Sequence, residues 1–289
     1  MSINSIIFRK ICARSDAARD SGLSTPPEIE RFDDIQYGSD PKWQVLDVYR
    51  PKAKKGKLPV IVSFHGGGWV YGDKNVYQFY CMNLSKRGFA VVNFTYHLAP
   101  KYRYPIQFED ANKVFAWLME NAEKYGFDTE NIFAVGDSAG AMGIALYSCI
   151  LTNSGYAKNY SFNVPEGLKI KGLGLNCGIY SMTDPELVSG IKDFLPKGRF
   201  SEMLPLLNVP DKITSDFPPC YILTSNNDFL RSEPPALIKA LEKAGVKYAY
   251  KLYGDDHTHL GHVFHCDIKS EAAKQANDDE CGFLSTLLS

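Results

Sequence analysis

Short apolar runs of strand length alternate along this chain with longer segments of helical periodicity. The clearest runs are LPVIVSF, AVVNF and NIFAV, within expected strands at 58–66, 88–100 and 131–138. Near-continuous apolar strands are typical of a parallel sheet covered on both faces. Strands that alternate with helices predict βαβ units, and therefore an α/β fold with a mainly parallel sheet.

The remaining elements follow the same alternation. Further strands are expected at 45–51, 169–178, 218–228 and 246–254, and residues 32–38 are expected to pair with the first of these as an edge hairpin. Helices are expected at 75–87, 108–125, 139–152, 235–244 and 270–288. The chain contains no internal repeat and no low-complexity linker. We therefore expect residues 1–289 to form a single α/β domain.

Two segments do not follow the alternation. Ile3, Ile7 and Ile11 recur at a spacing of four, which indicates an amphipathic helix. Residues 179–217 contain several prolines that interrupt any long helix. We interpret residues 1–31 and 179–217 as lid segments over the carboxyl edge of the sheet, and ordinary surface loops are the alternative.

Charge, hydropathy and cysteine content narrow the function classes. Lys and Arg total 32 against 33 Asp and Glu, so the net charge of −1 gives no electrostatic footprint for nucleic acid. No apolar run is long enough for a membrane span, and the N-terminus does not have the pattern of a secretory signal. The seven cysteines are odd in number and form no CxxC pair. They favour free thiols in a reducing compartment, so we expect a cytoplasmic protein.

The segment GDSAG, residues 136–140, matches the pattern Gly-x-Ser-x-Gly around Ser138. It follows the apolar strand NIFAV and opens the helical run AGAMGIALYSCIL. A sharp turn between a strand and a helix can present such a serine as a nucleophile, with the helix N-terminus directed at developing negative charge. The alternative is a serine that merely caps the helix.

Three consecutive glycines, Gly66, Gly67 and Gly68, follow the strand LPVIVSF. They allow backbone amides to approach a ligand without obstruction by side chains. A glycine loop in this position supplies oxyanion donors in enzymes with a Gly-x-Ser-x-Gly nucleophile. A phosphate-binding loop is disfavoured because no Lys-Ser/Thr follows. His65 could be a metal ligand or a base, but we expect it to brace the loop by hydrogen bonding.

Together these segments resemble the hormone-sensitive-lipase-like group of α/β-hydrolase carboxylesterases. The shared segments, in family order, are HGGGWVYGD, YHLAPKYRYP, DTENIFAVGDSAG, LTSNNDFLR and GHVF. The resemblance implies the α/β-hydrolase fold, with an eight-stranded, mostly parallel sheet flanked by helices and a lid built from the N-terminus and the 179–217 insertion. It also implies oxyanion donors from the backbone amides of Gly67, Gly68 and Ala139.

The chain departs from the family pattern in two places. His97 and Lys101 stand where the family usually has Arg and Glu, which removes a familiar ion pair beneath the site. Asn226 and Asn227 precede the expected acid where the family usually has glycine.

A nucleophilic serine needs a base, and the base needs an orienting carboxylate; in this fold the chain order is serine, acid, histidine. Asp228 ends the apolar strand CYILTSNND, which predicts a position at the carboxyl edge of the sheet beside Ser138. Asp255 and Asp256 are the competing acids, but the acid normally follows the preceding strand. We therefore select Asp228.

Four of the six histidines lie in DDHTHLGHVFH, residues 255–265. His262 belongs to GHVF, which is similar to the histidine loop of the family. We expect His262 to be the base, with His259 as second choice. His257 and His259 are expected to be exposed, and His265 partly buried.

These features predict a serine carboxylesterase that uses Ser138, Asp228 and His262, needs no metal or organic cofactor, and hydrolyses short-chain acyl esters. Resemblance to bacterial acetylesterases adds acetylated sugars as candidate substrates. Two alternatives remain open. The His/Asp cluster at 255–265 could bind zinc in a metal-dependent hydrolase. The chain could also be a non-catalytic small-molecule-binding protein with the same fold.

Two further expectations concern substrate and assembly. Segment 179–217 carries an apolar set that would either receive an acyl chain or seat the lid on the sheet; it comprises Phe194, Phe200, Leu204, Leu206, Leu207 and Phe217. The strand at 246–254, with Tyr248 and Tyr250 on one face, is a candidate edge strand. An exposed edge can pair with a second copy, so a homodimer through this strand is predicted.

Overall fold

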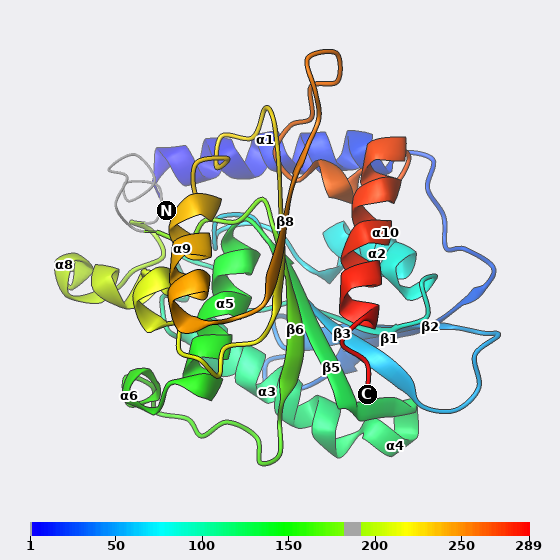
Figure 1. Ribbon diagram of the computed structural model, residues 1–289, viewed down its shortest axis with the longest axis horizontal. Coiled ribbons are helices and arrows are strands. Elements are labelled where there is room, and N and C mark those ends of the chain that lie inside the picture. Colours follow the sequence, from blue (N-terminus) through cyan, green and yellow to red (C-terminus); the bar gives the residue numbers. More distant parts are fainter. Residues whose placement is uncertain (1, 182–191) are drawn as a thin grey trace.

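The computed structural model describes residues 2–181 and 192–289, and within them eight strands form one sheet (Figure 1). The strands are β1 (Ile29–Gln36), β2 (Val45–Pro51), β3 (Leu58–Phe64), β4 (Ala90–Phe94), β5 (Phe127–Asp137), β6 (Ile170–Asn176), β7 (Cys220–Ser225) and β8 (Tyr248–Tyr253). Their spatial order is β1-β2-β4-β3-β5-β6-β7-β8.

Six of these strands run parallel. The antiparallel pairs are β1 with β2 and β2 with β4, whereas β4, β3, β5, β6, β7 and β8 pair in parallel. This confirms the predicted edge hairpin and the predicted mostly parallel, eight-stranded sheet. Because parallel strands share one carboxyl edge, the loops after β3, β5, β7 and β8 open at the same edge.

Helices cover both faces of the sheet. On one face lie α3 (Ile106–Glu120), α5 (Ala139–Thr152) and α9 (Pro234–Ala244), and on the other lie α2 (Lys74–Ser85) and α10 (Glu271–Ser285) (Figure 1). Val60 and Val62 pack into the core of the first face, and Ile61 packs into the core of the second. Burial on both faces is the reason for the near-continuous apolar runs.

Helix α1 (Ile3–Asp20) crosses the molecule near the loops that follow the strands (Figure 1). Its N-cap is Ser2, whose side chain accepts a hydrogen bond from Ser5 N. The insertion, within its described residues 192–217, contains α8 (Phe200–Met203) and two 3₁₀ turns, η1 (Leu204–Leu207) and η2 (Val209–Lys212). Residues 182–191, which complete the predicted 179–217 lid segment, lie outside the described residues.

Several element boundaries differ from the predictions. The apolar run 88–100 forms a strand only from Ala90 to Phe94, because β4 pairs with β3 and β2 no further than that. The expected helix 108–125 is two helices, α3 and α4 (Ala122–Tyr125). They meet at Asn121, whose side chain donates to the carbonyl of Trp117 (2.9 Å).

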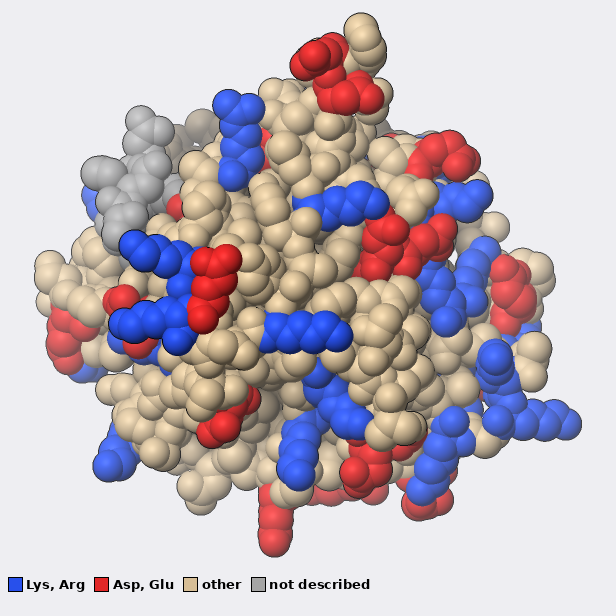
Figure 2. Space-filling model, in the orientation of Figure 1, with Lys and Arg blue, Asp and Glu red and all other residues tan. Residues whose placement is uncertain are grey.

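The sheet ends at β8, which has neighbours on one side only. Tyr250 and Leu252 on this strand are exposed. A homodimer through this edge stays a prediction. Basic and acidic side chains are interspersed over the face seen in Figure 2, in keeping with the balanced net charge. None of the described helices combines the length and the apolar character that crossing a bilayer requires.

Candidate active site

Ser138 lies at the turn between β5 and α5, at the carboxyl edge of the sheet. Its backbone angles are φ 52° and ψ −119°, a sparsely populated conformation for a residue with a side chain. The Ser138 amide donates to the carbonyl of Asn176 on the neighbouring strand (2.9 Å), which holds the turn in place. A Cβ at Gly140 would collide with the carbonyl of Phe64, so only glycine fits where α5 approaches β3.

The glycine loop after β3 lies beside this turn. Gly67 and Gly68 have φ of 101° and 60°, in the left-handed region that favours glycine. Among the described residues, none accepts a hydrogen bond from the amides of Gly67, Gly68 or Ala139. Ala139 is the first residue of α5, where an amide has no partner within the helix. These three amides are therefore available to a ligand.

Asp137 joins the turn that holds Ser138 to the glycine loop. Its carboxylate accepts hydrogen bonds from Gly66 N (3.2 Å) and from the Tyr77 hydroxyl (2.8 Å), and Tyr77 also contacts Gly66 N (3.1 Å). Burial raises the pKa of Asp137 to about 6, opposed by the Tyr77 hydrogen bond and the nearby His262. Sequence reasoning treated Asp137 only as the variable position of Gly-x-Ser-x-Gly and missed this contact.

His65 braces the glycine loop, as predicted. Its Nδ1 donates to the carbonyl of Gly66 (2.8 Å), and its ring stacks on Tyr96 with centroids 4.0 Å apart. The Tyr96 hydroxyl donates to the carbonyl of His65 (2.8 Å). Burial lowers the pKa of His65 to about 4, so the ring is neutral at pH 7.

The structure brings His262 and Asp228 together. Nδ1 of His262 lies 2.9 Å from Oδ1 of Asp228. Asp228 also accepts from the amide of Leu230 (2.8 Å) and from the Thr224 hydroxyl (3.3 Å). Burial alone would raise the pKa of Asp228, but these partners, His262 foremost, hold it below its ordinary value. The ionised carboxylate can only accept, so Nδ1 of His262 donates and Nε2 keeps its lone pair.

The other histidines of the 255–265 segment do not join this pair. His257 and His259 are exposed, as predicted. Asp255 accepts hydrogen bonds from the amides of His257 (2.8 Å) and Thr258 (2.7 Å), which makes it a turn residue. His265 is fully buried rather than partly buried, because its ring packs edge-on against Tyr80. Burial lowers the pKa of His265 to about 3.

The zinc alternative required the ligands of 255–265 to converge, and they do not. Within the described residues, the one group of three possible metal ligands consists of Cys177, Asp228 and His262. Only His262 of that group comes from the predicted cluster. The prediction of a compact 255–265 metal site is therefore wrong in its ligand set, because the loop directs its first three polar residues outward.

His97, which departs from the family pattern, keeps a charged partner. Its Nδ1 lies 2.7 Å from Asp110, and its Nε2 lies 3.4 Å from Asp40. Burial lowers the pKa of His97, but the hydrogen bond to Asp110 more than offsets this and leaves it raised. Lys101, the second departure, lies over the ring of Tyr102 at 4.7 Å. The expected loss of the family ion pair is thus partly compensated by the His97–Asp110 contact.

Two exposed aromatic residues flank the site, and sequence reasoning missed both. The ring of Phe229, 67% exposed, lies 4.4 Å from the ring of His262. Phe8 of α1 is the residue nearest to the open side of Gly68. A hollow of about 390 Å³ beside Asp228 is lined by Asn226, Asn227, Asp228, Phe229, Arg231 and Ser232. A larger cavity of about 590 Å³ lies between Arg9 and Lys74, and its lining includes none of Ser138, Asp228 and His262.

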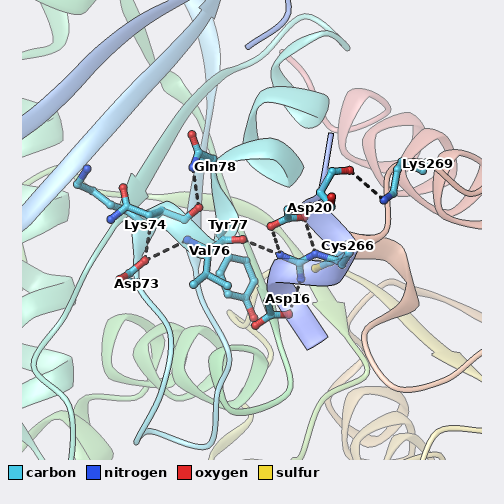
Figure 3. A network of polar contacts seen from close by, with 12 residues as sticks. Asp16, Asp20, Asp73, Lys74, Val76, Tyr77, Gln78, Cys266 and Lys269 are labelled. Atoms are coloured by element: carbon cyan, nitrogen blue, oxygen red, sulfur yellow. Dashed lines mark hydrogen bonds and ion pairs between the residues drawn. The ribbon is translucent and has the colours of Figure 1, made fainter. Parts of the chain in front are cut away.

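Helix α1 is fastened along its length. Arg9 donates to the carbonyls of Val70 and of Ala99 (2.9 Å to the latter), just beyond the glycine loop. Further along, the Tyr71 hydroxyl donates to Asp16 (2.8 Å). Arg19 pairs with Asp16 and Asp20 and donates to the carbonyl of Val76 (2.8 Å); Figure 3 shows this network joining α1 to the start of α2.

Three members of the predicted apolar lid set seat the insertion on the body of the protein. Phe194, Leu207 and Phe217 are buried in the main core. Phe194 stacks on Trp69 of the glycine loop, with centroids 4.4 Å apart. Phe200, Leu204 and Leu206 are partly buried against the same core. Of the two interpretations left open for this set, seating therefore accounts for the three buried members.

A protein-family model described as alpha/beta hydrolase fold matches residues 61–265, which include every residue of the site except α1. The chain belongs to this family. The resemblance to the hormone-sensitive-lipase-like carboxylesterases, suggested by the motifs, is confirmed.

Curated relatives of this α/β-hydrolase are named esterases. The chain is 27% identical over 229 residues to versiconal hemiacetal acetate esterase of Dothistroma septosporum, a match that covers 71% of this chain and 67% of the relative. It is 27% identical over 268 residues to esterase LipQ of Mycobacterium tuberculosis, covering 84% of this chain and 63% of LipQ. The chain thus spans about two thirds of the length of these relatives.

A solved structure is similar over nearly the whole chain. Esterase B from Lactobacillus rhamnosis, inhibited by a tributyrin phosphonate, superimposes with a TM-score of 0.90 at 24% identity, covering 98% of this chain and 94% of that one. At this level of identity the likeness supports the fold of the α/β-hydrolase and not its substrate.

Proposed function

We propose that this α/β-hydrolase is a serine carboxylesterase with the triad Ser138, His262 and Asp228. The observation that carries the proposal is the 2.9 Å contact that fixes the His262 imidazole on a buried carboxylate, at the sheet edge where Ser138 occupies its strained turn. A base with its tautomer fixed, at the same sheet edge as a serine at a helix N-terminus, fits the requirements of acyl transfer.

The mechanism follows from these groups. Ser138 Oγ attacks the ester carbonyl while Nε2 of His262 takes its proton, and Asp228 stabilises the imidazolium. The amides of Gly67, Gly68 and Ala139 donate to the tetrahedral oxyanion. Nε2 then protonates the leaving alcohol, and water releases the acyl group by the same route. Asp137 and Tyr77 hold the glycine loop against the nucleophile turn, so the donors are in place before substrate binds.

The proposed substrates are short-chain acyl esters. In support, one relative is named for an acetate ester. Phe194 and Leu207 are buried in the main core, and Phe194 stacks on Trp69. Acetylated sugars are a candidate class, and α1 with the described part of the insertion would act as the lid.

The test is the loss of the nucleophile. Ser138→Ala should lower kcat for p-nitrophenyl acetate by about 10⁴-fold or more, because the triad acts as a unit. The wild-type protein should be labelled by a fluorophosphonate, and the variant should not. An unlabelled wild-type protein that hydrolyses no short acyl ester would favour the non-catalytic alternative. A series of p-nitrophenyl esters from acetyl to octanoyl, run beside an acetylated oligosaccharide, ranks the substrates.

A further inference from the structure

Cys177 lies close to Asp228 and His262 and has an unusual backbone conformation. It follows β6 directly, has φ 47°, and its side chain is buried. Its amide donates to the carbonyl of Leu223 on β7 (2.8 Å). Val263, next to His262, also has a positive φ of 53°, which is rare for a β-branched residue. Backbone strain of this kind clusters at functional sites.

The thiol of Cys177 forms a compact group with two members of the proposed triad. The Cys177 thiol and the Asp228 carboxylate are both buried. One ligand atom from each of Cys177, Asp228 and His262 lies within 4.8 Å of the other two. The ligands of a tetrahedral zinc ion lie roughly 3.5 Å apart, given bond lengths of about 2.0–2.3 Å. The separations thus need to shorten by at most about 1.3 Å to reach a metal-binding arrangement.

We propose that Cys177, Asp228 and His262 form an inhibitory site for a thiophilic divalent cation, Cd²⁺ or Zn²⁺. Thiolate, imidazole and carboxylate together are a ligand set that suits these ions, and a fourth position is left for water. Hard cations such as Mg²⁺ and Ca²⁺ prefer oxygen ligands and are not expected to bind. The inhibition rests on the proposed esterase function, whereas binding of the cation does not.

The coordination step also explains why the bound ion would inhibit. The Cys177 thiol releases its proton to solvent and binds as thiolate. The His262 proton moves from Nδ1 to Nε2, so that Nδ1 coordinates the ion while the ring stays neutral. An Nε2 that carries a proton cannot accept another from Ser138, and Asp228 no longer orients the ring. Because the thiol must lose its proton to bind the ion, binding should weaken as the pH falls.

Binding is tested in Ser138→Ala, which retains all three ligands but lacks the nucleophile. Cd²⁺ should give the ultraviolet charge-transfer absorption of a cadmium–thiolate bond at one ion per chain. The absorption should be lost in Ser138→Ala/Cys177→Gly, in which glycine suits the positive φ, and also in Ser138→Ala/Cys177→Ser. The matched control is Ser138→Ala/Cys12→Ser, because Cys12 is the partly exposed thiol on α1. On titration with Cd²⁺, this control should give the same cadmium–thiolate absorption as Ser138→Ala.

Inhibition is tested in chains that keep Ser138. Cd²⁺ should reversibly inhibit hydrolysis of p-nitrophenyl acetate by the wild-type protein, with recovery on EDTA. Cys177→Gly, referred to its own metal-free rate, should need at least tenfold more Cd²⁺ for half inhibition. Equal cadmium–thiolate absorption with and without Cys177, or its loss in the Cys12 control alone, would overturn the site. A chain without esterase activity that still shows Cys177-dependent absorption would overturn the proposed function and leave the site standing.

Discussion

At the scale of single residues, Asp228 is held by three hydrogen-bond donors. It accepts from His262, from the amide of Leu230 and from the Thr224 hydroxyl, and its side chain is excluded from solvent. A carboxylate surrounded by donors keeps its charge at neutral pH and fixes the ring that donates to it. The orientation of His262 therefore depends on the charge at position 228.

Replacing this charge by an amide should disable the base without deleting it. In Asp228→Asn, the amide can present its NH₂ group to Nδ1, which stabilises the tautomer with the proton on Nε2. We expect kcat for p-nitrophenyl acetate to fall by about 10³- to 10⁴-fold, with an unchanged circular dichroism spectrum. Asp256→Asn, in the exposed loop, is the control and should retain wild-type kcat. A large loss of kcat in Asp256→Asn but not in Asp228→Asn would show that Asp256, and not Asp228, is the acid.

Phe229 offers a second prediction, about binding rather than chemistry. Its exposed ring lies against His262, the group proposed to protonate the leaving alcohol. We expect Phe229→Ala to raise KM for p-nitrophenyl acetate about fivefold or more with little change in kcat, because an aromatic contact between Phe229 and the nitrophenyl ring would contribute about 1 kcal/mol. Tyr250→Ala removes another exposed aromatic ring, on β8. An equal rise in KM for both variants would contradict a specific contact.

Some residues of the site could be predicted from the sequence, and others could not. Motif context placed Ser138, Asp228 and His262 on loops that the fold brings to one edge, since each follows a recognisable strand. Asp137, Tyr77 and Cys177 could not be found in this way. Each is a single polar residue in or beside an apolar run, and its partner is fixed only when two strands or a strand and a helix pack together.

At the scale of elements, the strands were predictable and their ends were not. Residues 89–99 are buried, and those after β4 are buried because the loop packs against Trp69 and α3, not because they stay in the sheet. Burial makes both parts equally apolar, so hydropathy cannot separate them. In α1, by contrast, apolar residues are not buried. Its isoleucines are exposed, and only Ser5 is buried. The predicted helix is present, but its apolar stripe does not face the body of the protein.

Since α1 buries so little, its polar anchors should control its attachment. Arg9 makes two hydrogen bonds to backbone carbonyls next to the glycine loop, and a hydrogen bond from a charged group contributes about 1.5–3 kcal/mol. We expect Arg9→Ala to increase the rate of amide hydrogen exchange in residues 3–20 by about tenfold or more. Lys10→Ala, its exposed neighbour, should leave the exchange rate unchanged. Identical exchange in both variants would show that Arg9 does not hold the helix.

At the scale of the whole molecule, a buried acid links the C-terminal helix to the nucleophile turn. Glu280 of α10 accepts from Asn176 Nδ2 (2.8 Å) and from the Tyr80 hydroxyl of α2 (3.2 Å). The carbonyl of Asn176 in turn accepts from Ser138 N. Burial raises the pKa of Glu280 to about 7, with the hydrogen bonds from Asn176 and Tyr80 opposing it. Helix α10 thus supports the turn that holds Ser138.

The raised pKa of Glu280 predicts how the stability of the protein changes with pH. The folded protein binds a proton at Glu280 more tightly than the unfolded chain, whose glutamate has a pKa near 4.5. The stabilisation from this proton is fully present below about pH 4.5 and is lost as the pH rises to about 7. Glutamine imitates the protonated acid at every pH. Relative to wild type, Glu280→Gln should therefore gain stability between pH 4.5 and 7, by up to roughly 3 kcal/mol.

The comparison is made by urea unfolding of both chains at several pH values from 4.5 to 7.5. Other buried groups, such as Asp228 and His65, change the stability of both chains alike, so the difference between them isolates position 280. At pH 4.5 both folded chains carry an uncharged side chain there and should unfold at nearly the same urea concentration, which serves as the internal control. A difference in unfolding free energy that stays constant across this range would mean that Glu280 is charged in the folded protein, and that its contacts with Asn176 and Tyr80 outweigh its burial.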